Sequence, residues 1–508
     1  MEIAHKNEGV LSRTVTAGRW SSLNILVQKV LSFGSLVVLA RLIQPSDFGI
    51  VTLATLVPGV LYTLTSPNFG AAFIQSSRDL SSYLNVMWTF RILRALIIAL
   101  LVWFIGEWLA SFFHISGAVW IVRLSSFAIV FQAFSNIGDL YFVKDIDFRK
   151  HFVRDIVIKS IYTTVAISGG FIFRSYLAIF LAMIALELSG FIMTYILSPY
   201  RPHFDFNFSR LKDLLPQAKW FYSQDLLGLV YSNTDNILIG RFAGAGAVGL
   251  WGKANALATI PSPIGSMINK IGFPALAKIQ EDRTKVTEGV MRMFDIMLLA
   301  TLPVAATILI AGNRLILLLL GPDWLAMVPI LKVLTIGMTI NMVFFTINEP
   351  ALNSIGQARV QSYLQALYCI MFVTLLLVLV PKFGAIGAAW AILVASSVIG
   401  IETMRLLRKF ISLNAKRVLA TALIITLITI LLALIGLLLL EIPIFNHDLG
   451  FIILAGCLGI TYFLLTITFG HVFGLRGPAQ TIKLILLSSL PRSVARKLSG
   501  ILPPARTS

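Results

Sequence analysis

The chain alternates long apolar stretches with short polar ones, and the apolar stretches are much longer than those of soluble proteins. Neither Lys, Arg, Asp nor Glu occurs in residues 48–77, 360–381, 383–401, 418–440 or 449–475. A helix needs about 20 mostly apolar residues to cross the hydrocarbon core of a bilayer. A membrane β-barrel would instead show segments of about ten residues with alternating polarity, which this chain lacks. The pattern therefore predicts an all-α integral membrane protein.

Gly, Pro and clusters of charge divide the apolar sequence into about fourteen predicted membrane-spanning helices. They lie near residues 17–40, 47–67, 86–110, 119–139, 153–173, 175–197, 217–240, 246–269, 291–312, 324–347, 359–380, 384–404, 418–440 and 449–472. The longest connections, near 198–216 and 273–290, are too short for a soluble catalytic domain. We therefore expect no enzyme and no cofactor.

The distribution of charge orients these spans. The chain has 508 residues, of which 13% are charged, and a formal net charge of +18. The cations lie between apolar spans and not in one soluble patch, so they do not indicate nucleic-acid binding. One set of connections holds most of the Lys and Arg residues, and the other set holds Arg41, Arg123, Arg174, Arg241, Arg314 and Lys382. By the positive-inside rule, the cation-rich side and both termini are predicted to be cytoplasmic.

An internal repeat organises the predicted spans. An offset of 200 residues aligns Trp20 with Trp220, Arg41 with Arg241 and Gly49 with Gly249. A second offset of 210 aligns Arg149 with Arg359 and Gly190 with Gly400. An even number of spans per copy keeps both copies in one orientation, with an axis along the membrane normal.

This repeat predicts two six-helix lobes, a cleft between them and two additional C-terminal helices. The expected parts are a cytoplasmic N-terminus (1–16), an N-lobe (17–198), a cytoplasmic linker (199–216), a C-lobe (217–410), two further spans (418–472) and a basic amphipathic cytoplasmic tail (473–508).

Three segments carry a family resemblance: LVVLARLIQPSDFGIVTLATLV, TDNILIGRFAGAGAVGLWGKANALATIP and INKIGFPALAKIQED. They resemble the Wzx-type polysaccharide and oligosaccharide flippases of the multidrug/oligosaccharidyl-lipid/polysaccharide (MOP) superfamily, nearest to the branch with colanic acid and teichuronic acid exporters. The resemblance covers most of residues 10–410. It implies a two-lobe transporter in the bacterial inner membrane that moves undecaprenyl-pyrophosphate-linked oligosaccharides from the cytoplasmic to the periplasmic leaflet. A polysaccharide polymerase and chain-length or export machinery are further partners that it suggests.

Three alternatives stay open at this point: a lipid II flippase, a multidrug or cation antiporter of the same superfamily, and a membrane polymerase or ligase. The chain has no GxxxxGK[ST] loop, so direct use of ATP is not expected.

Charged residues inside spans are the site candidates, because a charge at bilayer depth costs about 2.5 kcal/mol or more unless it faces water or a partner. Lys29 is deep in the first span, where it faces the cleft and a pyrophosphate, extends toward the membrane surface, or pairs with a distant helix. Arg91 and Arg94 enter the third span and, with Asp139, form either a funnel for an anionic headgroup or a salt bridge.

Three further groups of charges belong to this set. Asp235 and Lys253 are predicted to form an ion pair or, alternatively, a site where Asp235 takes up a coupling ion as Lys253 is released to substrate. Glu187 and Lys159 are expected to pair, and Lys332 is a weaker cleft candidate. Intramembrane prolines are hinge candidates: Pro58, Pro261, Pro263, Pro303 and Pro329.

Overall fold

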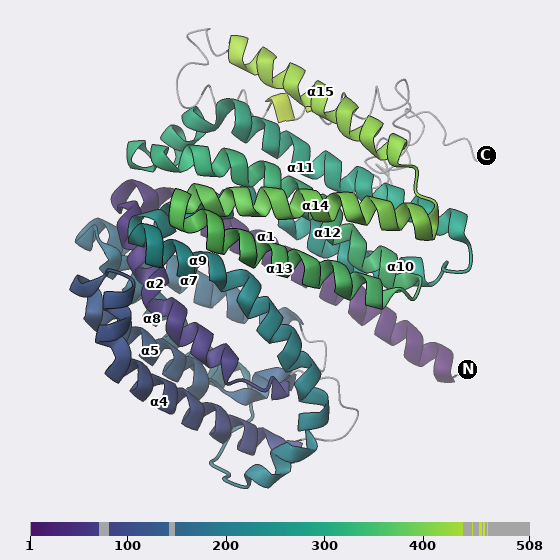
Figure 1. Cartoon of the computed structure of the whole chain (residues 1–508). Coiled ribbons are helices and arrows are strands. Elements are labelled where there is room, and N and C mark those ends of the chain that lie inside the picture. Colours follow the sequence, from purple (N-terminus) through teal and green to yellow (C-terminus); the bar gives the residue numbers. More distant parts are fainter. Residues whose placement is uncertain are drawn as a thin grey trace. The chain divides into compact units, whose positions relative to one another are not determined.

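The computed structural model describes residues 2–70, 81–141 and 148–439, with a few positions between 450 and 465. All regular elements in these ranges are helical, which confirms the predicted fold class. The chain divides into two compact units (Figure 1). The first contains residues 1–252, 319–324 and 380–385, and the second contains the rest. The first thus includes 217–252, which the sequence assigns to a second lobe, so the predicted lobe boundaries stay a prediction.

The first unit is built on helices that pack side by side. They are α1 (Glu2–Leu42), α2 (Pro45–Leu64), α4 (Ser81–Phe112), α5 (Val119–Phe134), α7 (Phe148–Phe173), α8 (Tyr176–Leu197) and most of α9 (Leu215–Ala258). Short 3₁₀ turns lie between them: η1 (Ser116–Ala118), η2 (Ile137–Asp139) and η3 (Phe208–Asp213). Within the unit, α1 packs on α7, α4 on α5, and α7 on α8.

The second unit contains the remaining long helices. They are α10 (Ser262–Ala277), α12 (Val328–Ser354), α15 (Ala415–Leu439) and most of α11 (Arg283–Leu319), α13 (Ala358–Phe383) and α14 (Ala385–Ile411). The turn η4 (Pro322–Met327) precedes α12. A buried core joins α11, α12, α14 and α15 through Phe294, Ile347, Leu407 and Ile425. The predicted tail at 473–508 lies outside the described residues.

Ten of the helices are long and apolar enough to cross a membrane, counted over the described residues. The protein is therefore a multi-pass membrane protein, while the count of fourteen is not confirmed. The apolar helix Val119–Phe134 is too short to be included. Helix α9 carries Asp225, Asn233 and Asp235 along its length, which lowers its mean hydropathy. Most of the predicted span 449–472 lies outside the described residues.

Glycine and proline interrupt α9 and its continuation near the predicted places. Gly244 has a φ of 80° inside α9, a left-handed conformation that glycine adopts without steric penalty. The predicted span 246–269 is not continuous, because α9 ends at Ala258 and α10 starts at Ser262. Pro261 is the N-cap residue of α10, while Pro303 stays inside α11.

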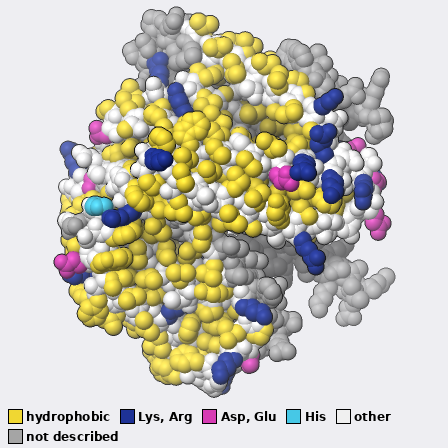
Figure 2. Space-filling view, viewed as in Figure 1, with side chains coloured by type: hydrophobic (Ala, Val, Ile, Leu, Met, Phe, Trp, Pro, Cys, Tyr) yellow, Lys and Arg dark blue, Asp and Glu magenta, His cyan; other side chains and the backbone are white. Residues whose placement is uncertain are grey.

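Much of the protein surface is apolar, which is unusual for a protein surrounded by water. Figure 2 shows hydrophobic side chains over most of one face, with Lys and Arg gathered in separate groups. Large side chains such as Phe104 (73%), Ile172 (72%) and Ile401 (72%) are among the most exposed. Monomeric soluble proteins rarely expose contiguous apolar patches of this kind. These side chains are suited to contact with lipid tails.

The two glycines that the repeat aligns make reciprocal contacts within the first unit. A Cβ built on Gly49 would lie 1.7 Å from the carbonyl oxygen of Ala245, and one built on Gly249 would lie 1.8 Å from that of Pro45. The offset of 200 that aligns Gly49 with Gly249 also aligns Pro45 with Ala245. Reciprocal contacts of this kind are what two copies related by a two-fold axis produce.

A polar network joins α1 to α7. The Asp155 carboxylate accepts a hydrogen bond of 2.8 Å from Asn24 on α1 and pairs with His151 at 3.0 Å and Arg154 at 2.9 Å. Arg154 also pairs with Asp139 at 3.1 Å. A buried charge that is paired and hydrogen-bonded avoids most of its desolvation penalty. The network therefore fixes α7 against α1 and against the turn that follows α5.

Candidate functional site

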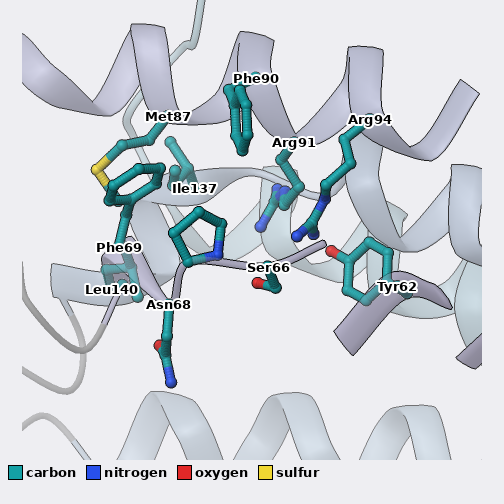
Figure 3. Close-up of a pocket in the computed structure, with 12 residues that line it drawn as sticks. Tyr62, Ser66, Asn68, Phe69, Met87, Phe90, Arg91, Arg94, Ile137 and Leu140 are labelled. Atoms are coloured by element: carbon teal, nitrogen blue, oxygen red, sulfur yellow. The ribbon is translucent and has the colours of Figure 1, made fainter. Parts of the chain in front are cut away.

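A small pocket in the first unit gathers two of the predicted cations. It has a volume of about 140 Å³ and lies between the end of α2, the following turn, α4 and η2 (Figure 3). Its lining residues are Tyr62, Ser66, Pro67, Asn68, Phe69, Gly70, Met87, Phe90, Arg91, Arg94, Ile137 and Leu140. Arg91 and Arg94 are three residues apart on α4, so their side chains leave the same helix face. In Figure 3 both point from α4 toward the segment with Tyr62 and Ser66.

Arg91 is held by the end of α5. Its Nε donates a 3.0 Å hydrogen bond to the carbonyl oxygen of Ala133, and its terminal nitrogen donates to the carbonyl oxygen of Ser135. The last carbonyls of a helix have no partner within the helix, so they are free to accept such bonds. These bonds fix the guanidinium of Arg91 in place without neutralising its charge.

Arg94 is 9% exposed, and its guanidinium carbon lies 4.1 Å from the centroid of the Tyr62 ring. Stacking on an aromatic face stabilises a cation and leaves its edge able to donate. The Nε of Arg94 has no hydrogen-bond partner among the described residues. A buried donor without a partner costs about 1–3 kcal/mol. The donor and the charge are therefore available to an anionic ligand.

The pocket wall opposite α4 is tied to α9. Asn68 donates a 2.7 Å hydrogen bond to Asp225, and the Tyr222 hydroxyl donates a 2.6 Å bond to the carbonyl oxygen of Leu64. Asn68 has a φ of 50°, which Asn tolerates better than most residues. Asp and Glu are absent from the lining residues of the pocket. The described wall thus gives the two arginines neutral hydroxyl and amide neighbours.

The other predicted site residues are not among the lining residues of this pocket. Lys29 is exposed on α1 and makes no hydrogen bond or ion pair with a described residue. Lys332 lines a separate hollow of the second unit together with Arg314. Lys253 is half-buried and belongs to the second unit. The structure therefore brings together Arg91 and Arg94, and it leaves the cleft roles of the three lysines as predictions.

Asp235 is buried in the first unit, with 8% of its surface exposed. Its Oδ2 accepts a 2.8 Å hydrogen bond from the Trp251 indole, and its Oδ1 accepts one of 2.7 Å from the backbone nitrogen of Asn236. Its partners are neutral donors, and the predicted partner Lys253 belongs to the other unit. The ion pair and the coupling role of Asp235 stay predictions.

Two expected pairings are wrong. Glu187 forms no ion pair with a described residue, and the Lys159 ammonium lies 4.6 Å from the centroid of the Tyr162 ring instead. Asp139 pairs with Arg154 at 3.1 Å and not with Arg91 or Arg94. Lys159 thus contacts a ring one turn away on its own helix, whereas Asp139 in η2 pairs with an arginine of α7.

Sequence reasoning missed the neutral members of both polar groups. Tyr62, Ser66 and Asn68 line the arginine pocket, but hydroxyl and amide residues near helix ends are common and carry no specific signal. Asn24 and Gln28 are four residues apart on α1, as are His151 and Asp155 on α7. Such spacing places two polar side chains on one helix face, and that signal predicts a polar contact between helices.

The fold is an all-helical membrane architecture that solved structures share. The structure matches the lipid II flippase MurJ in its inward closed conformation with a TM-score of 0.71, over 89% of this chain and 99% of that one, at 16% identity. It also matches an inward-facing multidrug resistance MATE family transporter of the MOP superfamily, with a TM-score of 0.53 and 16% identity over 78% of this chain and 98% of that one. These likenesses establish the MOP fold.

The family follows from the sequence. A family model described as polysaccharide biosynthesis protein matches residues 38–329, more than half of the chain, so the chain belongs to that family. The teichuronic acid biosynthesis protein TuaB of Bacillus subtilis is 25% identical over 80% of this chain and 84% of its own length. The succinoglycan biosynthesis transport protein ExoT of Rhizobium meliloti is 25% identical over 69% of this chain and 71% of its own length. The predicted family resemblance is confirmed.

Proposed function

We propose that this protein is a flippase that moves undecaprenyl-pyrophosphate-linked oligosaccharide repeat units from the cytoplasmic to the outer leaflet of the bacterial inner membrane. The proposal includes alternating access as the mechanism and surface polysaccharide synthesis as its purpose. Family membership and the MOP fold support it. The cation-rich connections support an orientation with both termini in the cytoplasm. A polymerase and chain-length machinery would then receive the product.

The observation that carries the proposal is the Arg91–Arg94 pocket. A diphosphate bears oxygens that planar guanidinium groups bind with two parallel hydrogen bonds. Two arginines with no carboxylate among the lining residues give this pocket a net positive charge. Partial burial strengthens the attraction, because the effective dielectric constant is lower than in water. The pocket is thus suited to the diphosphate and not to an organic cation, which distinguishes the flippase from a cation antiporter.

The experiment uses cells that lack the gene and accumulate lipid-linked repeat units. They are complemented with wild type, Arg94→Gln, Arg94→Lys or Arg123→Gln. The last variant is the control, because Arg123 lies outside the lining of the pocket. Intracellular undecaprenyl-linked units and surface polysaccharide are both measured. We expect wild type and Arg123→Gln to clear the accumulated units, Arg94→Gln to leave them, and Arg94→Lys to be intermediate. Equal membrane levels of all variants exclude a folding defect.

Two outcomes would contradict the proposal. If the double variant Arg91→Gln/Arg94→Gln cleared the accumulated units fully, the pocket would not be needed for transport. Repeat units that reach the outer leaflet of the deletion strain but stay unpolymerised would identify an enzyme that joins them, and the flippase function would be wrong.

A further inference from the structure

Two helix pairs, one in each unit, place a glycine against a long cationic side chain. In the first unit, a Cβ built on Gly106 of α4 would lie 2.8 Å from Cγ of Arg123 on α5. In the second unit, a Cβ built on Gly312 of α11 would lie 3.6 Å from Cε of Lys332 on α12. The internal repeat equates α4 and α5, the third and fourth spans, with α11 and α12, the ninth and tenth. The two pairs are therefore comparable positions.

In the first pair the charge of the cation is compensated. The Arg123 guanidinium lies 3.8 Å from the carboxylate of Glu107, the residue that follows Gly106. Its Nε donates a 3.1 Å hydrogen bond to the carbonyl oxygen of Trp103, and its centre lies 5.8 Å from the Trp103 ring centroid. This pair has both an anion and an aromatic face for its cation.

In the second pair, the described residues give Lys332 neither an anion nor an aromatic face of the kind that Arg123 has. The residue that follows Gly312 is Asn313, and Arg314 comes next. Lys332 is half-buried and makes no hydrogen bond or ion pair with any residue in the described ranges. It lies four residues into α12, about 6 Å along the axis at about 1.5 Å per residue. Among the described residues, Arg123 of the first unit thus has a carboxylate partner and Lys332 of the second unit has none.

Lys332 lines a hollow of about 820 Å³ that also has apolar lining residues. Its lining residues are Asn313, Arg314, Leu317, Leu325, Val328, Pro329 and Lys332. Leu317 is 49% exposed and Leu325 is 39% exposed. An amide and cations beside exposed leucines combine the two chemistries of a phospholipid, a charged phosphate and an acyl chain. A soluble phosphate would make no use of the leucines.

We propose that this hollow binds an anionic phospholipid of the bilayer. Lys332 contacts the phosphate as a point charge, Asn313 donates to it, and the acyl chains lie along Leu317 and Leu325. A lysine near a helix end extends toward the headgroup region, which places its ammonium at the depth of lipid phosphates. The site is separate from the Arg91–Arg94 pocket, and it does not depend on the transported substrate.

The test measures lipid binding by the purified full-length protein. Native mass spectrometry in detergent, with graded phosphatidylglycerol or phosphatidylcholine, gives the occupancy of bound lipid, and thermal unfolding gives the stabilisation that each lipid produces. The variants are Lys332→Ala and Asn313→Glu, which rebuilds the neutral pair of the first unit. The matched control is Arg123→Ala. A variant that unfolds without lipid at the temperature of wild type is folded and interpretable.

We expect wild type to prefer phosphatidylglycerol and both hollow variants to bind it about fivefold more weakly, as one cation near a lipid headgroup implies. Arg123→Ala should bind as wild type does. Unchanged phosphatidylglycerol binding in Lys332→Ala and Asn313→Glu would overturn the proposal. Displacement of phosphatidylglycerol by polyprenyl diphosphate at equal concentration would assign the hollow to the substrate and would overturn it as well. Neither result bears on flipping, which the cellular assay measures separately.

Discussion

Gly249 packs against Gly49 so closely that a Cβ built on Gly249 would lie 3.3 Å from the backbone nitrogen of Gly49. The first turn of α2 and the part of α9 after Gly244 meet here through their backbones alone. The contact is reciprocal, since each glycine also faces the carbonyl oxygen of the residue four positions before the other. Backbone atoms cannot rotate away as a flexible side chain can, so this junction has no room for any larger residue.

We therefore expect Gly49→Ala and Gly249→Ala to destabilise the protein by more than the roughly 1–3 kcal/mol typical of overpacking. Thermal unfolding in detergent measures the effect. Gly246→Ala is the control on the same segment, because a Cβ there meets nothing within 4 Å. It should be neutral or stabilising, by up to about 1 kcal/mol, since alanine favours helix over glycine. Equal unfolding temperatures for all three variants would show that the junction accommodates side chains.

The sequence aligns Gly49 with Gly249 through the repeat, but the alignment does not predict that the two glycines pack against each other. The sequence predicted most helix positions, because a long apolar run that ends at Gly, Pro or a charged residue leaves few other ways to place a helix. Helix α9 shows the limit. Asp225 is hydrogen-bonded by Asn68, 157 positions away, and Asp235 by Trp251, 16 positions away beyond the break at Gly244. A hydropathy pattern holds no information about such partners.

The sequence predicted the two arginines of the pocket but not the residues around them, for the same reason. Arg91 and Arg94 are conspicuous because charge is rare and costly within spans. The expected partner Asp139 was wrong, since choosing among carboxylates requires the side-chain geometry that places Arg154 nearer. Tyr62 contributes a ring face, and nothing in its sequence context separates it from other tyrosines near helix ends.

Tyr62 contacts Arg94 through its ring, and its hydroxyl also interacts with the guanidinium; we expect the ring to make the larger contribution. The guanidinium lies 4.1 Å from the ring centroid, and a desolvated contact of this kind contributes about 2 kcal/mol. We expect Tyr62→Phe to transport nearly as well as wild type and Tyr62→Leu to be reduced by about tenfold or more in the clearance of lipid-linked units. The matched pair differs only in the aromatic face. A defect in Tyr62→Phe as large as that in Tyr62→Leu would assign the role to the hydroxyl.

Asp155 should be a stability residue. Its carboxylate accepts from Asn24 and pairs with His151 and Arg154, so Asp155→Ala leaves the Asn24 amide without this acceptor and leaves Arg154 with Asp139 as its remaining carboxylate. Because the pair is only partly buried, we expect a cost below the roughly 3–5 kcal/mol of breaking a fully buried pair. Asp155→Asn keeps one acceptor for Asn24 and should cost less. Unfolding temperatures of the two variants, beside that of the exposed control Lys29→Ala, check the order. A stable Asp155→Ala protein would show that α1 and α7 hold together without the network.

Variants of Asp235 and Trp251 can distinguish a structural role of Asp235 from a role in ion coupling. Asp235→Asn keeps an oxygen that can accept from the Trp251 indole, which lies 2.8 Å from the carboxylate. It removes the charge, and its amide nitrogen takes the place of the Oδ1 that accepts from the backbone nitrogen of Asn236. Trp251→Phe keeps the charge and removes the donor. If Asp235 carries the coupling ion, Asp235→Asn should unfold within about 2 °C of wild type yet lose the response of transport to an imposed ion gradient. Trp251→Phe should be less stable, because the buried carboxylate loses a partner, and it should keep the gradient response. Reconstituted vesicles with a proton or sodium gradient measure that response. Normal gradient-driven transport by Asp235→Asn would leave Asp235 with a structural role, since a neutral amide cannot exchange a cation.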